Sequence, residues 1–204
     1  MTHLEQPDRG NHTGFPGAPT DQRAHKKALR ATIRAARDAR PAAEQRAFAE
    51  QLAGWTPPEG TRRVSCFIGV GSEPDTGPLI AALTARGIEV LLPITLDDFS
   101  LDWALYTGDD HLVDARFGLR EPDGERLGAE GIASADIVLI PALAIDADGR
   151  RLGQGAGCYD RALPHVADDT PVLGVVFPDE RLVEPLPEEP HDRRVDGVIP
   201  HLEV

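Results

Sequence analysis

Short apolar runs recur along this chain, separated by longer stretches in which apolar residues return every three or four positions. A continuous run of four to six apolar residues is typical of a strand that is buried on both faces. On continuous or once-interrupted runs of this kind, we predict strands at 64–68, 88–92, 137–140, 172–177 and 195–199. Residues 101–106 form a further candidate strand inside a polar, loop-rich region that extends from 94 to 132.

The stretches between these runs have the spacing of amphipathic helices. The first helix is expected to begin at residue 20 or 21 and to end at Arg40, because Pro41 cannot continue it. Leu29, Ile33 and Ala36 recur at helical spacing and are predicted to form its buried stripe. Further helices are predicted at about 42–53, 76–87 and 158–165.

The alternation of strand and helix predicts parallel strand pairing, because a helical crossover returns the chain in the same direction. We expect an α/β fold with a three-layer α/β/α arrangement and a mostly parallel central sheet, Rossmann-like but without the dinucleotide fingerprint. Residues 1–20 are predicted to be a disordered N-terminal extension, and 21–204 to form a single domain. Ligands of such folds bind at the carboxyl ends of the strands, here the turn after Ile68 and the loop after Ile140.

Composition and charge exclude several classes of protein. The chain has 204 residues, of which 41% are hydrophobic and 27% charged, which is ordinary for one globular domain. Its net charge of −13 disfavours a general nucleic-acid or anionic-membrane binder, since both need a basic surface. Cys66 and Cys158 are far apart and indicate neither a zinc site nor a disulfide framework. With no export signal and no membrane-length apolar run, we expect a cytoplasmic monomer whose partners are small molecules, with no nucleic acid and no membrane.

The glycine-rich run at 149–163 carries the clearest chemistry. Gly153, Gly155 and Gly157 alternate just before a predicted helix. Backbone N–H groups of alternating glycines can converge on a small anion, and phosphate is the ligand that such a loop most often binds. The run is neither a Walker A loop nor a dinucleotide loop, because the required spacings are absent. A tight turn between strand and helix is the alternative.

Basic residues gather on one face of the first predicted helix. Lys26, Arg30, Arg34 and Arg37 are spaced by four, four and three residues, so they project from the same side. In a chain of net negative charge, a local basic stripe indicates an anionic ligand such as a polyphosphate. An ordinary solvated helix face explains the same pattern and stays open as an alternative.

Carboxylates follow the segments where the site is expected. Of Glu73 and Asp75, which come after the first strand, one is expected to cap a helix and the other to accept hydrogen bonds from a substrate. Asp160 follows Gly157, the last of the three alternating glycines, and Asp196 lies near the start of the last predicted strand. Carboxylates beside a bound phosphate are usual holders of Mg²⁺. For Asp196, a turn or salt-bridge role is the alternative.

Together these motifs resemble the 5-formyltetrahydrofolate cyclo-ligase family, also called 5,10-methenyltetrahydrofolate synthetase, over residues 24–200. Residues 26–30 resemble the family's N-terminal Lys-x-x-Leu-Arg motif, and 73–76 its Glu-x-Asp/Glu-Thr motif. Glu121 and Pro122 match a short Glu-Pro element. The most specific match is Arg151-Leu152-Gly153-x-Gly155-x-Gly157 followed by Tyr159-Asp160-Arg161.

The resemblance implies a role for each matching position. It implies that ATP contacts Lys26, Lys27, Arg30, Arg151, Gly153, Gln154, Gly155, Ala156, Gly157, Cys158 and Tyr159. It implies that folate contacts Glu73, Gly155, Gly157 and Tyr159. Its implied metal ligands are Asp160 and Asp196, and its implied catalytic residues are Arg151 and Tyr159.

The activity implied by the resemblance is the conversion of 5-formyltetrahydrofolate to 5,10-methenyltetrahydrofolate, with ATP as co-substrate, Mg²⁺ as cofactor, and release of ADP and phosphate. The formyl oxygen attacks the γ-phosphoryl group, and N10 then closes the ring as phosphate leaves. This chain departs from the family's usual residues at Cys158, where an aromatic is common, and at Gln154, Ile145 and Ala156. Two alternatives stay open: a non-catalytic folate- or nucleotide-binding protein of the same fold, and a phosphotransfer enzyme acting on another small molecule.

Overall fold

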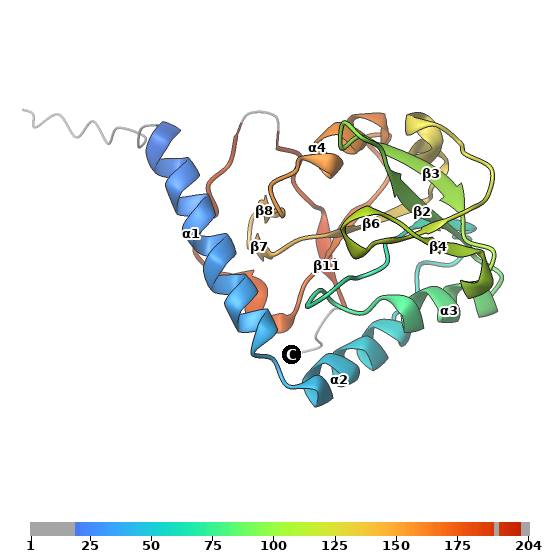
Figure 1. Cartoon of the computed structure of the whole chain (residues 1–204), viewed down its shortest axis with the longest axis horizontal. Coiled ribbons are helices and arrows are strands. Elements are labelled where there is room, and N and C mark those ends of the chain that lie inside the picture. Colours follow the sequence, from blue (N-terminus) through green and yellow to red (C-terminus); the bar gives the residue numbers. More distant parts are fainter. Residues whose placement is uncertain (1–18, 190–191, 201–204) are drawn as a thin grey trace, which may run out of the picture.

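The computed structural model describes residues 19–189 and 192–200. Its centre is a six-stranded sheet in the order β11-β9-β6-β1-β2-β3, of which Figure 1 labels β11, β6, β2 and β3. Its strands are β1 (Arg63–Ser65), β2 (Glu89–Thr95), β3 (Leu101–Leu105), β6 (Ile137–Pro141), β9 (Val172–Val175) and β11 (Gly197–Ile199). Neighbouring strands are parallel except β2 and β3. The fold is therefore mixed α/β with a large, mostly parallel sheet, as predicted.

All five predicted strands lie in this sheet, and the candidate at 101–106 is its antiparallel edge strand. β2 and β3 run in opposite directions because the connection at 96–100 is too short for a crossover. β1 is shorter than predicted: Cys66 still donates its backbone N–H to the Leu91 carbonyl oxygen of β2 at 2.9 Å, and Cys66 and Phe67 are buried beyond the end of the strand.

The helices are α1 (Pro19–Asp38), α2 (Ala42–Ala53), α3 (Gly77–Ala85) and α4 (Cys158–Ala162). α1 includes the last two residues of the predicted extension, and residues 1–18 of that extension lie outside the described residues. α4 is shorter than the predicted helix at 158–165, whose remainder is a 3₁₀ turn (Leu163–His165). Pro164 lies in this turn and has no N–H with which to continue an α-helix.

The side chains of β6 alternate between two apolar clusters. Ile137 and Leu139 belong to the cluster that includes α2 and α3. Val138 and Ile140 belong to the cluster that includes α4 and β3. The sheet is thus buried on both faces, which explains why its strands read as continuous apolar runs.

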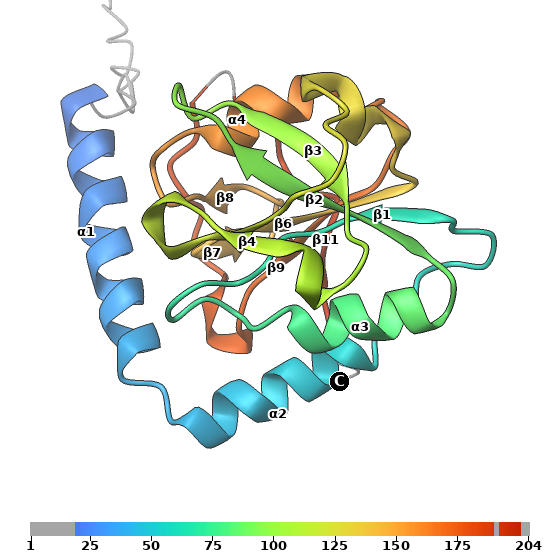
Figure 2. The ribbon, with the colours of Figure 1, turned by 45° about the vertical axis from the view of Figure 1, so that its right-hand side comes forward.

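α1 lies apart from α2 and α3 (Figures 1 and 2). It packs beside a second sheet of order β10-β7-β8, formed by β7 (Ala144–Asp146), β8 (Arg151–Leu152) and β10 (Arg181–Leu182). Leu29 and Ile33 pack against the apolar cluster of this sheet, as predicted. Ala36 is exposed, so its place in the predicted stripe is wrong, and the buried residue next to it is Arg37.

The polar region from 94 to 132 contains a hairpin that the sequence does not predict. It pairs β4 (Leu112–Asp114) with β5 (Arg120–Pro122) in antiparallel register. Strands of three residues are too short to show an apolar alternation, which is why the pattern gives no signal. The hairpin is held against the end of β2 by a hydrogen bond from the Thr95 backbone N–H to Glu121 Oε1, at 2.8 Å.

Candidate functional site

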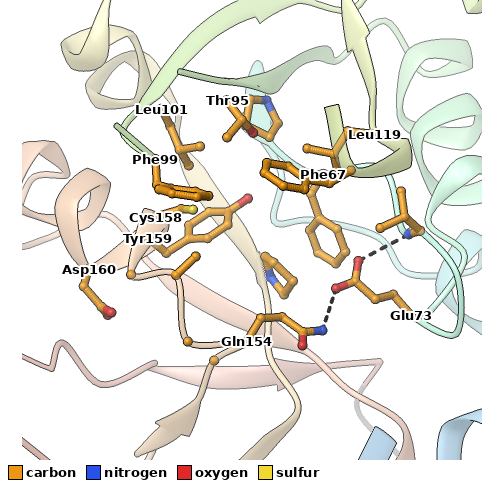
Figure 3. Close-up of a pocket in the computed structure, with 18 of the residues that line it drawn as sticks. Phe67, Glu73, Thr95, Phe99, Leu101, Leu119, Gln154, Cys158, Tyr159 and Asp160 are labelled. Carbon is orange, nitrogen blue, oxygen red and sulfur yellow. Dashed lines mark hydrogen bonds between the residues drawn. The ribbon is translucent and has the colours of Figure 1, made fainter. Parts of the chain in front are cut away.

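A cavity of about 1120 Å³ lies at the carboxyl ends of β1, β2 and β6. Its walls come from α1, the loop after β1, the hairpins β2–β3 and β4–β5, and the glycine-rich run. Figure 3 shows part of this lining, in which apolar and polar side chains face a common space. The position agrees with the prediction, since residues 67–73 follow β1 and Pro141 ends β6.

The glycine-rich run presents its backbone to the cavity. Gly155 and Gly157 have φ values of 107° and 72°, in the region that favours glycine. A Cβ at Gly153 would lie 3.3 Å from Arg151 Nη1, so a side chain there would crowd the guanidinium. All residues from 153 to 157 line the cavity. A tight turn alone does not require that placement, whereas an anion cradle does.

The basic face of α1 lies against this glycine-rich run. Arg30 Nε donates to the carbonyl oxygen of Gly153 at 2.8 Å. Arg34 Nη2 donates to Gln154, at 3.0 Å to its carbonyl oxygen and 2.8 Å to its side-chain oxygen. Both arginines line the cavity. These two members of the basic stripe therefore line the cavity, which favours a ligand-binding role for them although Arg34 remains exposed.

The other basic residues of α1 have different surroundings. Lys26 is buried in the cavity wall, with its Nζ 3.1 Å from Asp192 Oδ2. Lys27 is exposed and outside the lining, so the structure does not bring it to the other predicted ATP contacts. Arg37 forms a buried ion pair with Glu180 at 2.7 Å and fixes the end of α1 instead of facing the cavity.

Arg151 and Asp160 form an ion pair at the cavity. The Arg151 side chain is 6% exposed, and its Nη2 donates to Asp160 Oδ1. Its Nε is buried and has no hydrogen-bond partner within the part of the chain that the structure describes. A buried N–H without an acceptor is costly, so a ligand that brings an anionic oxygen fits this position.

Glu73 is held at the cavity wall by two hydrogen bonds (Figure 3). Its Oε1 accepts from Gln154 Nε2 at 3.0 Å, and its Oε2 accepts from the Val70 backbone N–H at 3.2 Å. Because Arg34 holds Gln154, a continuous polar path joins α1, the glycine-rich run and the loop after β1. Asp75 caps α3 by accepting the N–H of its first residue at 2.9 Å, so it is the helix-capping member of the predicted pair.

Tyr159 lies across the apolar part of the cavity, beside Cys158 and Phe99 (Figure 3). Its ring meets Trp103 edge to face at 6.5 Å, and its hydroxyl is buried without a partner among residues 19–189 and 192–200. Burial raises the pKa of Tyr159 well above its ordinary value, and it also raises the pKa of the Cys158 thiol. Both groups are therefore neutral at physiological pH, and Tyr159 can donate a hydrogen bond to a ligand.

The structure does not bring Asp196 to Asp160. Asp196 precedes β11 and accepts the backbone N–H of Val172 at the amino end of β9, at 2.8 Å. Three residues of strand, about 10 Å, separate that end from the carboxyl end where the cavity opens. Asp196 is absent from the lining, and the described residues hold no group of three metal-ligating side chains. Because β11 is parallel to β9 and Asp196 comes directly before it, the carboxylate lies at the amino ends of these strands, away from the cavity.

Comparison with known proteins adds to this geometry. Residues 20–201 match the profile of the 5-formyltetrahydrofolate cyclo-ligase family. The chain belongs to this family.

The cyclo-ligase of Mycolicibacterium smegmatis is 42% identical over 181 residues, which cover 85% of this chain and 92% of the relative. The cyclo-ligase of Escherichia coli K12 is 34% identical over 140 residues, covering 67% and 76%. A solved 5,10-methenyltetrahydrofolate synthetase from Aquifex aeolicus superposes with a TM-score of 0.72 at 28% identity, covering 85% and 88%.

The apolar wall of this cyclo-ligase cavity is the part that sequence reasoning missed. It includes Phe67, Phe99, Leu101, Phe117 and Leu119. Phe99 and Phe117 stack at 5.9 Å between ring centroids, and each has a positive φ, 64° and 61°. Such values are strained for aromatic residues and are a recurrent feature of binding sites. Their position in two short hairpins left no periodic signal in the sequence.

Among the helices that the structure describes, including the 20-residue α1, none is long and apolar enough to cross a bilayer.

Proposed function

We propose that this protein is an ATP-dependent 5-formyltetrahydrofolate cyclo-ligase, which forms 5,10-methenyltetrahydrofolate and releases ADP and phosphate. The observation that carries the proposal is a single cavity with two contrasting sides. One side has the glycine-rich backbone with Arg30 and Arg151, and the other has an aromatic and aliphatic wall. A reaction between a nucleotide phosphate and a large heteroaromatic substrate needs both sides in one space.

The cationic side is assigned to the polyphosphate. Lys26, Arg30 and Arg151 supply positive charge, and the N–H groups of 153–157 supply donors for the transferring phosphoryl group. In this reaction the formyl oxygen is the nucleophile, so the protein needs none of its own. Its contribution is positioning and charge neutralisation, which account for most of the catalysis in phosphoryl transfer.

The apolar side is assigned to the folate ring system. Tyr159 offers its ring face and a protonated hydroxyl, and Glu73 offers carboxylate oxygens fixed by Gln154 and Val70. The apolar residues around them exclude water from the imidate-like phosphate formed on the N5-formyl group until N10 closes the ring and phosphate leaves. Cys158, where an aromatic is usual in the family, leaves Tyr159 and the phenylalanines of the hairpins to supply the aromatic contacts.

Asp160 is the residue that fits a Mg²⁺ ion bound with ATP. It lines the cavity beside Arg151, and one carboxylate together with phosphate oxygens is a sufficient set of ligands. When bound, Mg²⁺ would neutralise charge on the phosphate oxygens. Asp196 is assigned a structural role, since it ties β11 to the start of β9.

The proposal extends to the protein's partners, localisation, oligomeric state and layer arrangement. The partners are two small molecules, folate and ATP, without nucleic acid or membrane. We infer a cytoplasmic monomer, in keeping with a cavity whose walls come from one chain. We also infer that helices on both faces make the main sheet the middle of a three-layer, Rossmann-like arrangement.

The test is turnover. Purified protein with 5-formyltetrahydrofolate, ATP and Mg²⁺ is expected to form methenyl-folate, measured by its absorbance, with one phosphate released per product. Folded protein that binds both ligands without turnover would indicate the non-catalytic alternative. Phosphate release only with a different acceptor would indicate another phosphotransfer reaction.

Arg30→Ala is expected to raise the KM for ATP about tenfold, because a charge-assisted contact is lost at the glycine-rich run. The KM for 5-formyltetrahydrofolate is expected to change much less. Steady-state kinetics with each substrate varied in turn measure both values. Arg46→Ala, an exposed arginine on α2, is the matched control. An unchanged KM for ATP would remove Arg30 from the nucleotide site.

Asp160→Asn is expected to raise several-fold the Mg²⁺ concentration needed for half-maximal activity, because a neutral amide is a weaker ligand than a carboxylate. Asp196→Asn is expected to leave this concentration unchanged, because Asp196 lies at the other end of the strands. Activity measured against Mg²⁺ concentration compares the two variants. A shift caused by Asp196→Asn would restore it as a ligand.

A further inference from the structure

Glu121 is a carboxylate in the cavity wall that the reaction described above does not use. It lies on β5, opposite Val113 in the hairpin, and is 9% exposed. Its Oε1 accepts the backbone N–H of Thr95 at 2.8 Å, which anchors β5 to the end of β2. Because each carboxylate oxygen has two lone pairs, most of the accepting capacity of Glu121 stays open to the cavity.

Among the residues that the structure describes, no lysine or arginine forms an ion pair with Glu121. The other described buried carboxylates, Asp102, Asp146 and Glu180, each have an arginine within 4.0 Å. Within residues 19–189 and 192–200, Glu121 has only the Thr95 N–H as a donor. A buried carboxylate with so few donors is costly for folding. Its presence in a cavity wall indicates that a ligand supplies the missing donors.

The position of Glu121 in the cavity indicates which part of a ligand it meets. In Figure 3, Thr95, the residue that holds Glu121, lies on the opposite side of the cavity from Glu73 and Gln154. Gln154 belongs to the glycine-rich run, which is assigned to the phosphates. Glu121 is thus on the side of the cavity away from phosphoryl transfer, next to the apolar wall.

The pterin ring of the proposed substrate has a matching pair of donors. Its N5 bears the formyl group and must face the transferring phosphoryl group. The N3–H and the 2-amino group lie on the far edge of the pyrimidinone ring and point away from that reaction. Two parallel N–H donors match the two oxygens of a carboxylate, the geometry in which charge-assisted hydrogen bonds are strongest.

We propose that Glu121 recognises the 2-amino-4-oxopyrimidine edge of the pterin ring by accepting hydrogen bonds from N3–H and the 2-amino group. This inference rests on the proposed function for the identity of the ligand. Glu121 then determines specificity for the organic substrate and takes no part in phosphoryl transfer.

Glu121→Gln tests the assignment because glutamine keeps the size of the side chain and an acceptor for the Thr95 N–H, but loses the charge. The KM for 5-formyltetrahydrofolate is expected to rise about 10- to 100-fold, with the KM for ATP unchanged. Titrations with 5-formyltetrahydrofolate and with p-aminobenzoylglutamate, which lacks the pterin ring, are expected to show weaker binding of the first alone. Glu125→Gln, an exposed glutamate outside the lining, is the control.

Each other outcome overturns the proposal. If Glu121→Gln bound 5-formyltetrahydrofolate with wild-type affinity, and only Glu121→Ala had a lowered unfolding temperature, the role of Glu121 would be to hold β5 against β2. Equal weakening of both titrated compounds would place the contact outside the pterin edge. The proposed function fails separately: if the wild-type protein binds 5-formyltetrahydrofolate without turnover, the titrations still decide the role of Glu121.

Discussion

Arg151→Ala is expected to lower kcat about 100- to 1000-fold, the range found when one preorganised donor to a transition state is removed. Arg151 is nearly enclosed, lies beside Gly153 and has a buried Nε without a partner in the described chain. In such surroundings its charge is poorly screened by water, so it acts strongly on the phosphoryl group. Single-turnover measurements at saturating ATP and folate isolate this effect from binding.

Arg151→Lys distinguishes charge from geometry. Lysine keeps the positive charge but lacks the planar fork, so partial recovery of kcat is expected. Arg62→Ala removes an exposed arginine outside the cavity and is expected to behave as wild type. If Arg151→Ala retained full kcat with an unchanged unfolding temperature, the assignment of Arg151 to the transferring phosphate would be wrong.

Glu180→Ala is expected to lower the free energy of unfolding by about 3–5 kcal/mol, because it leaves the buried Arg37 charge without its partner. The two side chains are 2% and 4% exposed and are joined by two hydrogen bonds of 2.7 and 2.8 Å. Glu180 also accepts the Phe177 backbone N–H at 3.0 Å, which adds a second lost contact. Denaturant titration followed by circular dichroism measures the change.

Two comparisons show whether the uncompensated charge is the cause. The double variant Arg37→Met, Glu180→Leu removes both charges and is expected to cost much less than Glu180→Ala. Asp179→Ala breaks the neighbouring pair with Arg40, whose acid is largely exposed, and is expected to cost at most about 1 kcal/mol. A double variant as unstable as Glu180→Ala would point to packing loss instead.

The main sheet was predictable because its strands are covered on both faces. Burial on both sides makes the central strands mostly apolar, and Val138 and Leu139 are equally enclosed although they face opposite clusters. The side of the cavity that we propose for phosphate was also predictable as a cavity wall, since Gly153, Gly155 and Arg30 lie in local patterns with a direct physical meaning. In both cases the decisive information lies within a short stretch of sequence.

Other parts of the site depend on contacts between distant segments. Helical spacing groups Arg37 with Arg30, but it does not reveal that Glu180 draws Arg37 into the core. Nor does it reveal that Lys27, one position from a cavity residue, faces solvent. Phe99 and Phe117 meet only because two hairpins come together at the cavity. Such meetings are set by tertiary packing, so single-sequence patterns do not contain them.

The cavity's two sides have different origins in the chain, and this bears on how the protein can evolve. The side proposed for the nucleotide is built from α1 and the glycine-rich run, which are joined by hydrogen bonds. The aromatic side is built largely from the tips of two hairpins, which contact the rest of the cavity through few hydrogen bonds, such as the one from Arg161 Nη2 to the Phe99 carbonyl oxygen at 3.0 Å. Substitutions at the hairpin tips can therefore change which organic molecule is accepted while the phosphoryl-transfer machinery is inherited intact. Divergence within the family should accordingly be greater at these tips than in the nucleotide-binding segments.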